Sequence, residues 1–463
     1  MESELTRLTL AEASSLVRHK KVSPLELTEA CLRGIEESDS QLNAFITVAA
    51  DEAVMSAGRA GEEIAKGDHR GPLHGIPVAV KDLLDRAGAR TTYGSKIFAE
   101  HVPSADAAAV ERLLKEGAVL LGKLNLHEFA FGATGINAHH GACRNPWDTE
   151  RITGGSSSGS GAAVAAGQCF AALGTDTGGS IRIPASVCGV AGIKPTYGRV
   201  SRRGVLPLSW SLDHVGPLAR SVEDCAIMLQ AIAGDDPADA SSSAESVPDY
   251  RAALSGGVRG LRVGVPSEFF FDGADPEVGN AVRAAIDVLS GLGATMHDVS
   301  LPHIAQAPAA VTAIMLPEAL SIHQQRLAER PGDYGDDVPY RLELGATFTA
   351  LDYVTSQRFR EMIVAEWRRD VFDKVDVLAT PATPVTAGRI DKGDLQTTFS
   401  LIHNTNPLNL LGIPAISVPC GFTSSGLPIG LQLAGRWWDE ATVLRAAHAY
   451  ERATEWHKRH PPR

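Results

Sequence analysis

A run of glycine and serine, Gly154-Gly155-Ser156-Ser157-Ser158-Gly159-Ser160-Gly161, is followed by Thr175-Asp176-Thr177-Gly178-Gly179-Ser180-Ile181-Arg182. These segments place Ser156 and Ser180 in glycine-rich backbone, 24 residues apart. A serine hydroxyl becomes a strong nucleophile only when a base removes its proton, and a neutral lysine can act as that base. Lys81 lies 75 residues before Ser156, at the end of an apolar run. The three side chains therefore indicate a proton relay that ends in a nucleophile.

This arrangement resembles the amidase signature family, whose members hydrolyse amides with a Ser–cis-Ser–Lys triad. The resemblance covers most of the chain and is strongest from Gly71 to Pro217. A glycine- and serine-rich stretch alone would be weak support, because such sequences are common in linkers. Both serine motifs together with the lysine, at the family spacing, form a specific signal. The resemblance implies that Ser180 is the nucleophile, that Ser156 follows a cis peptide bond and relays the proton, and that Lys81 is the base.

The residues around Ser180 are expected to form an oxyanion hole. Its preceding glycines carry no Cβ, so several backbone N–H groups can turn toward one point. One such donor is worth roughly 3–4 kcal/mol of transition-state stabilisation. The expected donors are the N–H groups of Thr177, Gly178, Gly179 and Ser180.

Four further residues near the two serines leave alternatives open. Ser157 and Ser158 could share the chemistry of the relay, but the spacing selects Ser156. Ser158 also stands where the family usually has glycine, which leaves the local shape of the loop open. Asp176 and Arg182 flank the nucleophile and either orient its loop or form a simple structural ion pair.

Lys81 can accept a proton at neutral pH only if its own pKa is lowered. An exposed lysine titrates near ~10.4, and burial lowers this value by several units. The apolar residues 76–80 would carry Lys81 into the interior of the protein. The alternative is a surface lysine paired with Asp82, which the family motif argues against.

The composition is that of an ordinary soluble globular protein. Hydrophobic residues make up 44% of the 463 residues and charged residues 21%. The net charge of −12 argues against direct contact with nucleic acid. Six scattered cysteines without a C-x-x-C pair suit a reducing cytoplasm, and the opening Met1-Glu2-Ser3-Glu4 does not resemble a secretion signal. The least polar stretch, residues 159–174, predicts a buried core helix and no membrane association.

Local patterns predict alternating helices and strands. Thr9 with Glu12 and Ser23 with Glu26 have the spacing of helix-capping boxes. Short apolar runs bounded by turn residues predict buried strands, and they alternate with helical stretches as in an α/β protein. The predicted strands include residues 78–80, 118–121, 261–265, 376–380 and 415–419.

The resemblance implies a three-layer α/β/α sandwich around one mixed β-sheet, folded as a single domain over residues 1–463. Within it we expect a helical arm at residues 1–65, packed on the outside of the main body. A catalytic core at residues 71–217 and a substrate-pocket region at residues 300–400 complete the expected organisation.

The reaction implied is amide hydrolysis through an acyl-enzyme on Ser180, which releases a carboxylic acid and an amine or ammonia. Esters and carbamates could be cleaved by the same chemistry. The reaction needs no cofactor and no metal, and His127-Glu128 lacks the second histidine of a zinc-protease motif. We expect a small-molecule amide as the ligand and no direct nucleic-acid partner, and we leave a homodimer open.

The sequence leaves the natural substrate open. Phe131 could line an apolar pocket, with a core aromatic as the alternative. Arg360 lies where amidotransferase members of the family place a carboxylate-binding arginine, with a solvent-facing helix arginine as the alternative. We expect a stand-alone hydrolase of aryl or alkyl amides. The main alternative is the glutaminase subunit of a tRNA-dependent amidotransferase, which requires a partner chain. A more distant alternative is a non-enzymatic binding module.

Overall fold

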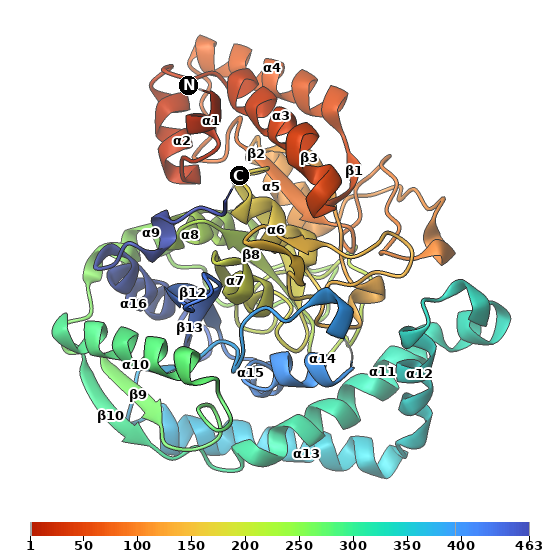
Figure 1. Ribbon diagram of the computed structural model, residues 1–463, viewed down its shortest axis with the longest axis vertical. Coiled ribbons are helices and arrows are strands. Elements are labelled where there is room, and N and C mark those ends of the chain that lie inside the picture. The colour runs from red at the N-terminus through yellow and green to blue at the C-terminus, as the bar shows by residue number, and fades with distance from the viewer. Residues whose placement is uncertain (1, 394, 463) are drawn as a thin grey trace.

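One mixed β-sheet runs through the molecule, and helices cover both of its faces (Figure 1). The computed structural model describes residues 2–393 and 395–462. In this part the sheet has eleven strands in the order β1-β3-β2-β6-β8-β7-β12-β13-β11-β9-β10. The expected three-layer α/β/α architecture around one mixed sheet is therefore confirmed. The strands are β1 (Phe45–Val48), β2 (Pro77–Lys81), β3 (Val119–Leu124), β6 (Ala171–Asp176), β7 (Ala191–Lys194), β8 (His214–Ala219), β9 (Arg262–Pro266), β10 (Thr295–Val299), β11 (Val377–Pro381), β12 (Ala415–Phe422) and β13 (Pro428–Gly435), with β4 (Arg144–Asn145) and β5 (Asp148–Ile152) in a separate small ribbon.

The helices that cover the sheet fall into two groups. One group, α6 and α7, packs together against the central strands, and the other, α8, α10 and α16, packs against the same strands with little contact to the first. Their bounds are α6 (Ser158–Ala165), α7 (Arg182–Cys188), α8 (Val222–Ile232), α10 (Pro276–Gly291) and α16 (Glu440–Arg452). Two shorter helices, α5 (Ala108–Lys115) and α9 (Tyr250–Ala253), contact α8.

The N-terminal helices lie together at one end of the molecule, at the top of Figure 1. Both predicted capping boxes are formed: the hydroxyl of Thr9 or Ser23 accepts the backbone N–H of the glutamate three residues later, and the carboxylate of that glutamate accepts the backbone N–H of the cap residue. The segment differs from a purely helical arm at residues 45–48, which form β1 and pair antiparallel with β3 at the edge of the sheet. Its sequence, Phe-Ile-Thr-Val, is rich in the aromatic and β-branched residues that strands prefer. The helices are α1 (Glu2–Leu5), α2 (Leu10–Arg18), α3 (Pro24–Leu42) and α4 (Ala50–Lys66).

The prediction of one buried helix over residues 159–174 is wrong in its second half. Helix α6 ends at Ala165, and Gly167 then adopts a left-handed φ of 73°. This conformation turns the chain, because residues other than glycine rarely adopt it. The following residues enter the sheet as β6, so the apolar stretch is a helix and a strand that are both buried.

A second layer of helices extends from the far end of the sheet, at the bottom of Figure 1. By length and composition alone, Ile304–Glu329 is apolar enough to cross a membrane, but half of its apolar window is buried in the fold, as in the core helix of a soluble protein. These helices are α11 (Ala307–Glu329), α12 (Asp337–Leu344), α13 (Ala350–Glu366), α14 (Leu395–Ile402) and α15 (Asn406–Leu411).

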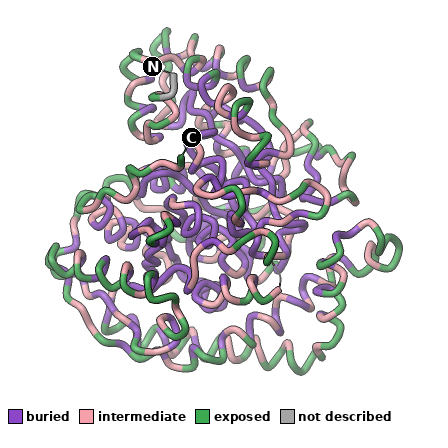
Figure 2. Tube along the Cα trace, viewed as in Figure 1, coloured by how far each residue is buried: buried purple, intermediate pink, exposed green. Residues whose placement is uncertain are grey.

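The core follows the sheet from end to end. Figure 2 shows buried residues concentrated around the strands and exposed residues on the outer faces of the peripheral helices. All six cysteines are buried in this interior as free thiols.

Candidate active site

The sheet places Lys81 in the interior because β2 lies between two other strands. Its neighbours β3 and β6 are both parallel to it, and Lys81 is the last residue of the strand. The side chain is fully buried. Its Nζ lies 2.7 Å from Ser156 Oγ, 2.7 Å from Thr175 Oγ1 and 3.1 Å from Ser157 Oγ. The predicted base and the predicted relay serine are therefore in direct hydrogen-bond contact.

The chemistry of these hydroxyls fits a neutral lysine. A neutral amine donates two hydrogen bonds and accepts one, so one of the three hydroxyls must donate to Nζ. Ser157 Oγ already donates to Thr175 O at 3.1 Å. In the described part of the chain Ser156 Oγ and Thr175 Oγ1 make no other hydrogen bond, so the proton of either hydroxyl is free to point at Lys81 Nζ.

Burial lowers the pKa of Lys81 to about 7, while the negative charges of Asp213 and Asp176 act in the opposite direction. Asp82 is not the partner of Lys81: its carboxylate lies 3.1 Å from Lys123 Nζ and accepts hydrogen bonds from Thr92. The surface alternative for Lys81 is therefore wrong, because a competing buried lysine neutralises Asp82.

The peptide bond between Gly155 and Ser156 is cis, as the resemblance implies. Ser157 N–H donates to Ser180 O at 3.3 Å and so ties the relay segment to the nucleophile segment. Ser158, which stands where the family usually has glycine, begins α6 and donates its hydroxyl to Asn125 O at 3.2 Å. The substitution therefore forms a structural contact and does not disturb the position of Ser156.

The Ser180 segment forms a tight turn between β6 and α7. Gly179 has a φ of 136°, and a Cβ at this position would lie 2.1 Å from Thr405 Oγ1. The Thr405 hydroxyl itself donates to Gly178 O at 2.6 Å. Ser180 is 8% exposed, and within the described residues its hydroxyl has no hydrogen-bond partner. This hydroxyl is accessible and uncommitted, as a nucleophile requires.

Asp176 and Arg182 form a fully buried ion pair beneath this turn. Arg182 Nη2 lies 3.0 Å from Asp176 Oδ1, and Arg182 Nε donates to Asp176 Oδ2 at 3.1 Å. Burial alone would raise the pKa of Asp176, but the guanidinium and its hydrogen bonds hold that pKa well below its ordinary value. The carboxylate also accepts the N–H groups of Gly179 and Ile181, on either side of Ser180. The pair is thus both a structural ion pair and a clamp on the nucleophile turn.

The same clamp narrows the expected oxyanion hole. Gly179 N–H donates to Asp176 Oδ1 at 2.8 Å, so it points away from any substrate carbonyl. The prediction that Gly179 N–H is an oxyanion donor is therefore wrong, because this N–H donates to the buried carboxylate of Asp176. In the part of the chain that the structure describes, the N–H groups of Thr177, Gly178 and Ser180 have no internal partner. These three remain candidate donors.

Neither of the two expected substrate-binding residues forms a hydrogen bond with the Lys81, Ser156 or Ser180 side chain among the described residues. Phe131 is buried in an apolar cluster with Leu83 and Phe129, and its carbonyl accepts a hydrogen bond from Arg341. Arg360, on α13, donates Nε to Leu410 O at 2.7 Å and Nη1 to Ser211 O at 3.0 Å. Arg360 is therefore not a simple solvent-facing arginine, since two of its nitrogens bind backbone carbonyls, one in α15 and one in the turn that contains Ser211.

Several contacts in the site come from residues that the sequence does not single out. Thr175 is within the glycine-rich motif, where strand alternation would place its side chain opposite that of Asp176. The others reach the site from distant segments, and no local pattern identifies them. They are Asp213, which accepts the Thr177 hydroxyl; Thr405; and Asn409 and Gln432, which accept hydrogen bonds from Arg182.

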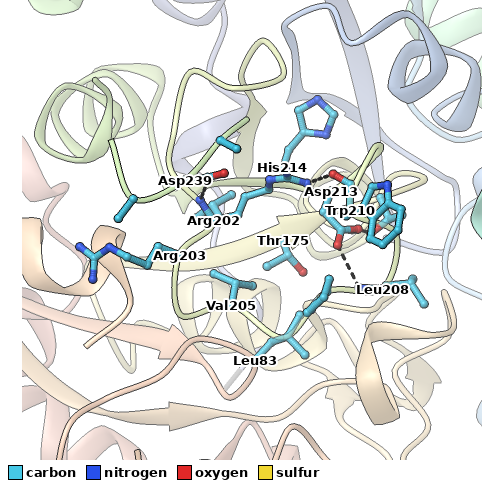
Figure 3. A pocket seen from close by; sticks show the side chains of 15 residues that line it. Leu83, Thr175, Arg202, Arg203, Val205, Leu208, Trp210, Asp213, His214 and Asp239 are labelled. Atoms are coloured by element: carbon cyan, nitrogen blue, oxygen red, sulfur yellow. Dashed lines mark hydrogen bonds between the residues drawn. The ribbon is translucent and has the colours of Figure 1, made fainter. Parts of the chain in front are cut away.

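A cavity of about 230 Å³ borders the site on the side of Thr175 and Thr177 (Figure 3). Its wall includes Leu83 and Asp213, and Arg202 and Trp210 also line it. Thr175, which contacts Lys81 Nζ, lines this cavity, whereas Ser180 is not among the residues that line it.

The activity should depend on pH through Lys81. Only the neutral amine can accept a proton, and its fraction increases as the pH rises through the lowered pKa of about 7. We expect kcat/KM to be several times higher at pH 8–9 than at pH 6, measured as initial rates of amine or ammonia release. Full activity at pH 5 would contradict the assignment of Lys81 as the base.

Comparisons with known proteins place this arrangement in a family. The family model described as Amidase matches residues 26–444. The A subunit of the glutamyl-tRNA(Gln) amidotransferase of Roseiflexus sp. (strain RS-1) is 45% identical over 483 aligned residues, which cover 99% of this chain and 98% of the relative. The chain belongs to the amidase family, and it is an enzyme of the amidase class, which hydrolyses C–N bonds.

Solved structures agree with the sequence comparison. A protein solved in work on a vestigial protein complex and the origins of an s-triazine catabolic enzyme is 38% identical, with a TM-score of 0.92 over 96% of this chain and 98% of that one. The A subunit of the glutamyl-tRNA(Gln) amidotransferase of Thermotoga maritima is 35% identical, with a TM-score of 0.84 over 99% and 97% of the two chains. A native peptide amidase from Stenotrophomonas maltophilia is 32% identical, with a TM-score of 0.84 over 96% and 97%.

Proposed function

We propose that this protein hydrolyses the side-chain amide of glutamine as the glutaminase subunit of a tRNA-dependent amidotransferase. The observation that carries this proposal is the match to amidotransferase A subunits from several bacteria, at 44–45% identity over nearly the whole of both chains. A stand-alone hydrolase of aryl or alkyl amides, which the sequence alone led us to expect, is supported less well by these comparisons.

In the proposed first half-reaction, Ser180 Oγ attacks the amide carbonyl. The Ser180 proton passes to Ser156 Oγ, and the Ser156 proton passes to Lys81 Nζ. The oxyanion is stabilised by the free N–H groups near Ser180. When the C–N bond breaks, the lysine returns its proton through Ser156 to the leaving nitrogen, so ammonia departs neutral and the acyl group stays on Ser180.

The second half-reaction uses the same relay for water. A water molecule gives its proton through Ser156 to Lys81 as its oxygen attacks the acyl carbon. The ester bond then breaks, and the proton returns to Ser180 Oγ. The carboxylic acid leaves and the enzyme regains its starting state, with every proton accounted for.

Arg360 is the proposed contact for the α-carboxylate of the substrate. Two of its nitrogens are held by Leu410 O and Ser211 O, while Nη2 has no hydrogen-bond partner among the described residues. Its guanidinium also lies 5.7 Å from the centre of the Tyr197 ring. A guanidinium fixed in this way can present the remaining N–H groups to a carboxylate without losing further side-chain entropy.

A second candidate function is the hydrolysis of other small amides. The protein from the work on an s-triazine catabolic enzyme has a higher identity and TM-score than the Thermotoga maritima amidotransferase subunit. The backbone of this chain therefore resembles that protein at least as closely as it resembles the amidotransferase subunit. In either case we propose a small-molecule amide as substrate. A cytoplasmic location and the absence of direct nucleic-acid contact remain predictions, the partner chain belongs to the glutaminase proposal, and a homodimer is left open.

The test compares glutamine with a neutral anilide, a carbamate and a primary aliphatic amide as substrates of the purified chain. Replacing Arg360 by leucine should raise KM for glutamine by roughly 10- to 100-fold, because a charge-assisted hydrogen bond is lost. The KM for the anilide should change little. Arg358→Leu is the matched control, since Arg358 is exposed on the same helix.

The outcomes separate the two candidates. Glutamine turnover that depends on Arg360 and not on Arg358 supports the glutaminase assignment. Turnover of the anilide, carbamate or simple amide without glutamine turnover would favour the second candidate. If all four substrates are inert, addition of candidate partner subunits is the next measurement, and glutamine hydrolysis that appears only with a partner supports the glutaminase.

A further inference from the structure

Asp213 is a buried carboxylate close to the catalytic centre that the proposed mechanism does not use. It lies directly before β8, which pairs with β6 so that His214 is opposite Asp176. Its Oδ1 accepts the Thr177 hydroxyl at 2.6 Å, and its Oδ2 accepts Leu208 N–H at 2.9 Å. Among the described residues it forms no salt bridge, in contrast to Asp176.

The contact with Thr177 reaches the candidate oxyanion hole. Thr177 is the first residue after β6, and its N–H is one of the three uncommitted donors. A short hydrogen bond from its hydroxyl to a buried carboxylate restricts the rotation of the side chain and of the attached peptide group. Loss of this hydrogen bond would let the donor move away from the direction that it now faces.

The charge of Asp213 also acts on Lys81. Two carboxylates oppose the effect of burial on the pKa of Lys81, and Asp213 is the larger contributor. The other, Asp176, is neutralised by its ion pair with Arg182. Burial raises the pKa of Asp213 itself to about 6, opposed by its hydrogen bonds and by the charge of Arg202. At pH 7 and above Asp213 is therefore ionised, and of the two carboxylates it is the one without a salt bridge among the described residues.

Hydrogen bonds link the loop before Asp213 to the outer helices α11 and α13. Ser209 N–H donates to Asp213, and Ser209 Oγ donates to Glu318 Oε2 on α11 at 2.6 Å. The same glutamate accepts the hydroxyl of Ser211 at 2.7 Å and that of Tyr353, on α13, at 2.9 Å. Asp213 is thus connected by hydrogen bonds to α11 and to α13, the helix that carries Arg360.

We propose that Asp213 is a positioning residue, which orients the Thr177 N–H toward the oxyanion and supplies the main negative charge that acts on Lys81. This inference rests on the proposed serine–lysine mechanism. A purely structural role, in which Asp213 only holds residues 208–212, would leave the pH dependence of the reaction unchanged.

The experiment measures the pH profile of kcat/KM, together with the rate at which a fluorophosphonate labels Ser180, followed by intact-mass and peptide mass spectrometry. In Asp213→Asn the charge is lost, Lys81 releases its proton more easily, and the midpoint of the profile should move to lower pH by about half a unit. The plateau should fall by roughly tenfold, because an oxyanion donor is less well oriented. Thr177→Val should lower the plateau and move the midpoint less than Asp213→Asn does, because Asp213 still carries its charge at high pH. Thr177→Ser should restore both.

Asp224→Asn is the matched control. Asp224 is equally buried, its pKa is also raised to about 6 by burial, and its carboxylate accepts Ala11 N–H in the N-terminal segment. This variant should keep both the plateau and the midpoint of the wild type.

Three results would overturn the inference. The first is a pH profile of Asp213→Asn whose midpoint equals that of the wild type. The second is a plateau of kcat/KM in Thr177→Val that equals that of the wild type. This second measurement remains informative if Asp213→Asn does not fold. The third is wild-type protein that is not labelled at Ser180, which rejects the serine–lysine mechanism and this inference with it. Because the third result is seen in the wild type, it is distinguished from the failure of Asp213 alone.

Discussion

Replacing Ser180 with alanine should lower kcat for amide hydrolysis by roughly a million-fold, the loss expected when a catalytic serine is removed. Of the side chains of Lys81, Ser156 and Ser180, that of Ser180 is the one whose polar atom is free of hydrogen bonds among the described residues. Substrate binding should change little, because alanine keeps the backbone N–H groups and removes one oxygen atom. The measurement is ammonia or amine release under single-turnover and steady-state conditions.

Ser160→Ala is the control for this variant. Ser160 is a buried serine on α6 whose hydroxyl donates to Leu173 O, outside the proposed relay. It should retain activity within a few-fold of the wild type. If Ser180→Ala retained a tenth of the wild-type rate, Ser180 could not be the nucleophile.

Replacing Lys81 with alanine should lower kcat/KM by about 10⁴-fold, because the relay loses its terminal base. Arginine at this position should be equally inactive, since its guanidinium stays protonated at any pH the protein tolerates. Ser157→Ala should cost only about tenfold: Ser157 contacts Nζ at 3.1 Å, but the 2.7 Å contacts with Ser156 and Thr175 remain. The measurement is kcat/KM between pH 6 and 9.

The comparison of the two variants decides the assignment. Equal losses in Lys81→Ala and Ser157→Ala would mean that the lysine acts only as a packing element of the serine segment. An arginine variant with substantial activity would show that the site needs a positive charge and not a base.

Local sequence is sufficient where neighbouring residues determine the structure. The two capping boxes at Thr9 and Ser23 are formed because each involves a side chain and a backbone N–H only three residues away. The strand that carries Lys81 is predicted by its apolar run, which β2 contains. The apolar stretch of residues 159–174 predicts one helix, because hydrophobicity alone does not distinguish a buried helix from a buried strand.

The site shows the same division between local and distant contacts. Lys81 and Ser156 can be paired from sequence because the resemblance supplies their roles, and the structure brings their polar atoms to 2.7 Å. Which N–H groups face the substrate could not be predicted, since it depends on Asp176 capturing that of Gly179. Asp213 is close to the centre only through the pairing of β6 with β8, a tertiary contact that no local pattern encodes.

Because its six thiols are buried, the folded protein should be unreactive toward thiol reagents. All six cysteines are inaccessible, and burial raises the pKa of each thiol, that of Cys31 to about 12, so the reactive thiolate is scarce. The rate at which a maleimide modifies the native chain therefore reports how often a cysteine-bearing segment opens. Conversely, one cysteine introduced on an exposed helix such as α13 would carry a single fluorophore without removal of any native residue, and so allow motions of that helix to be followed during turnover.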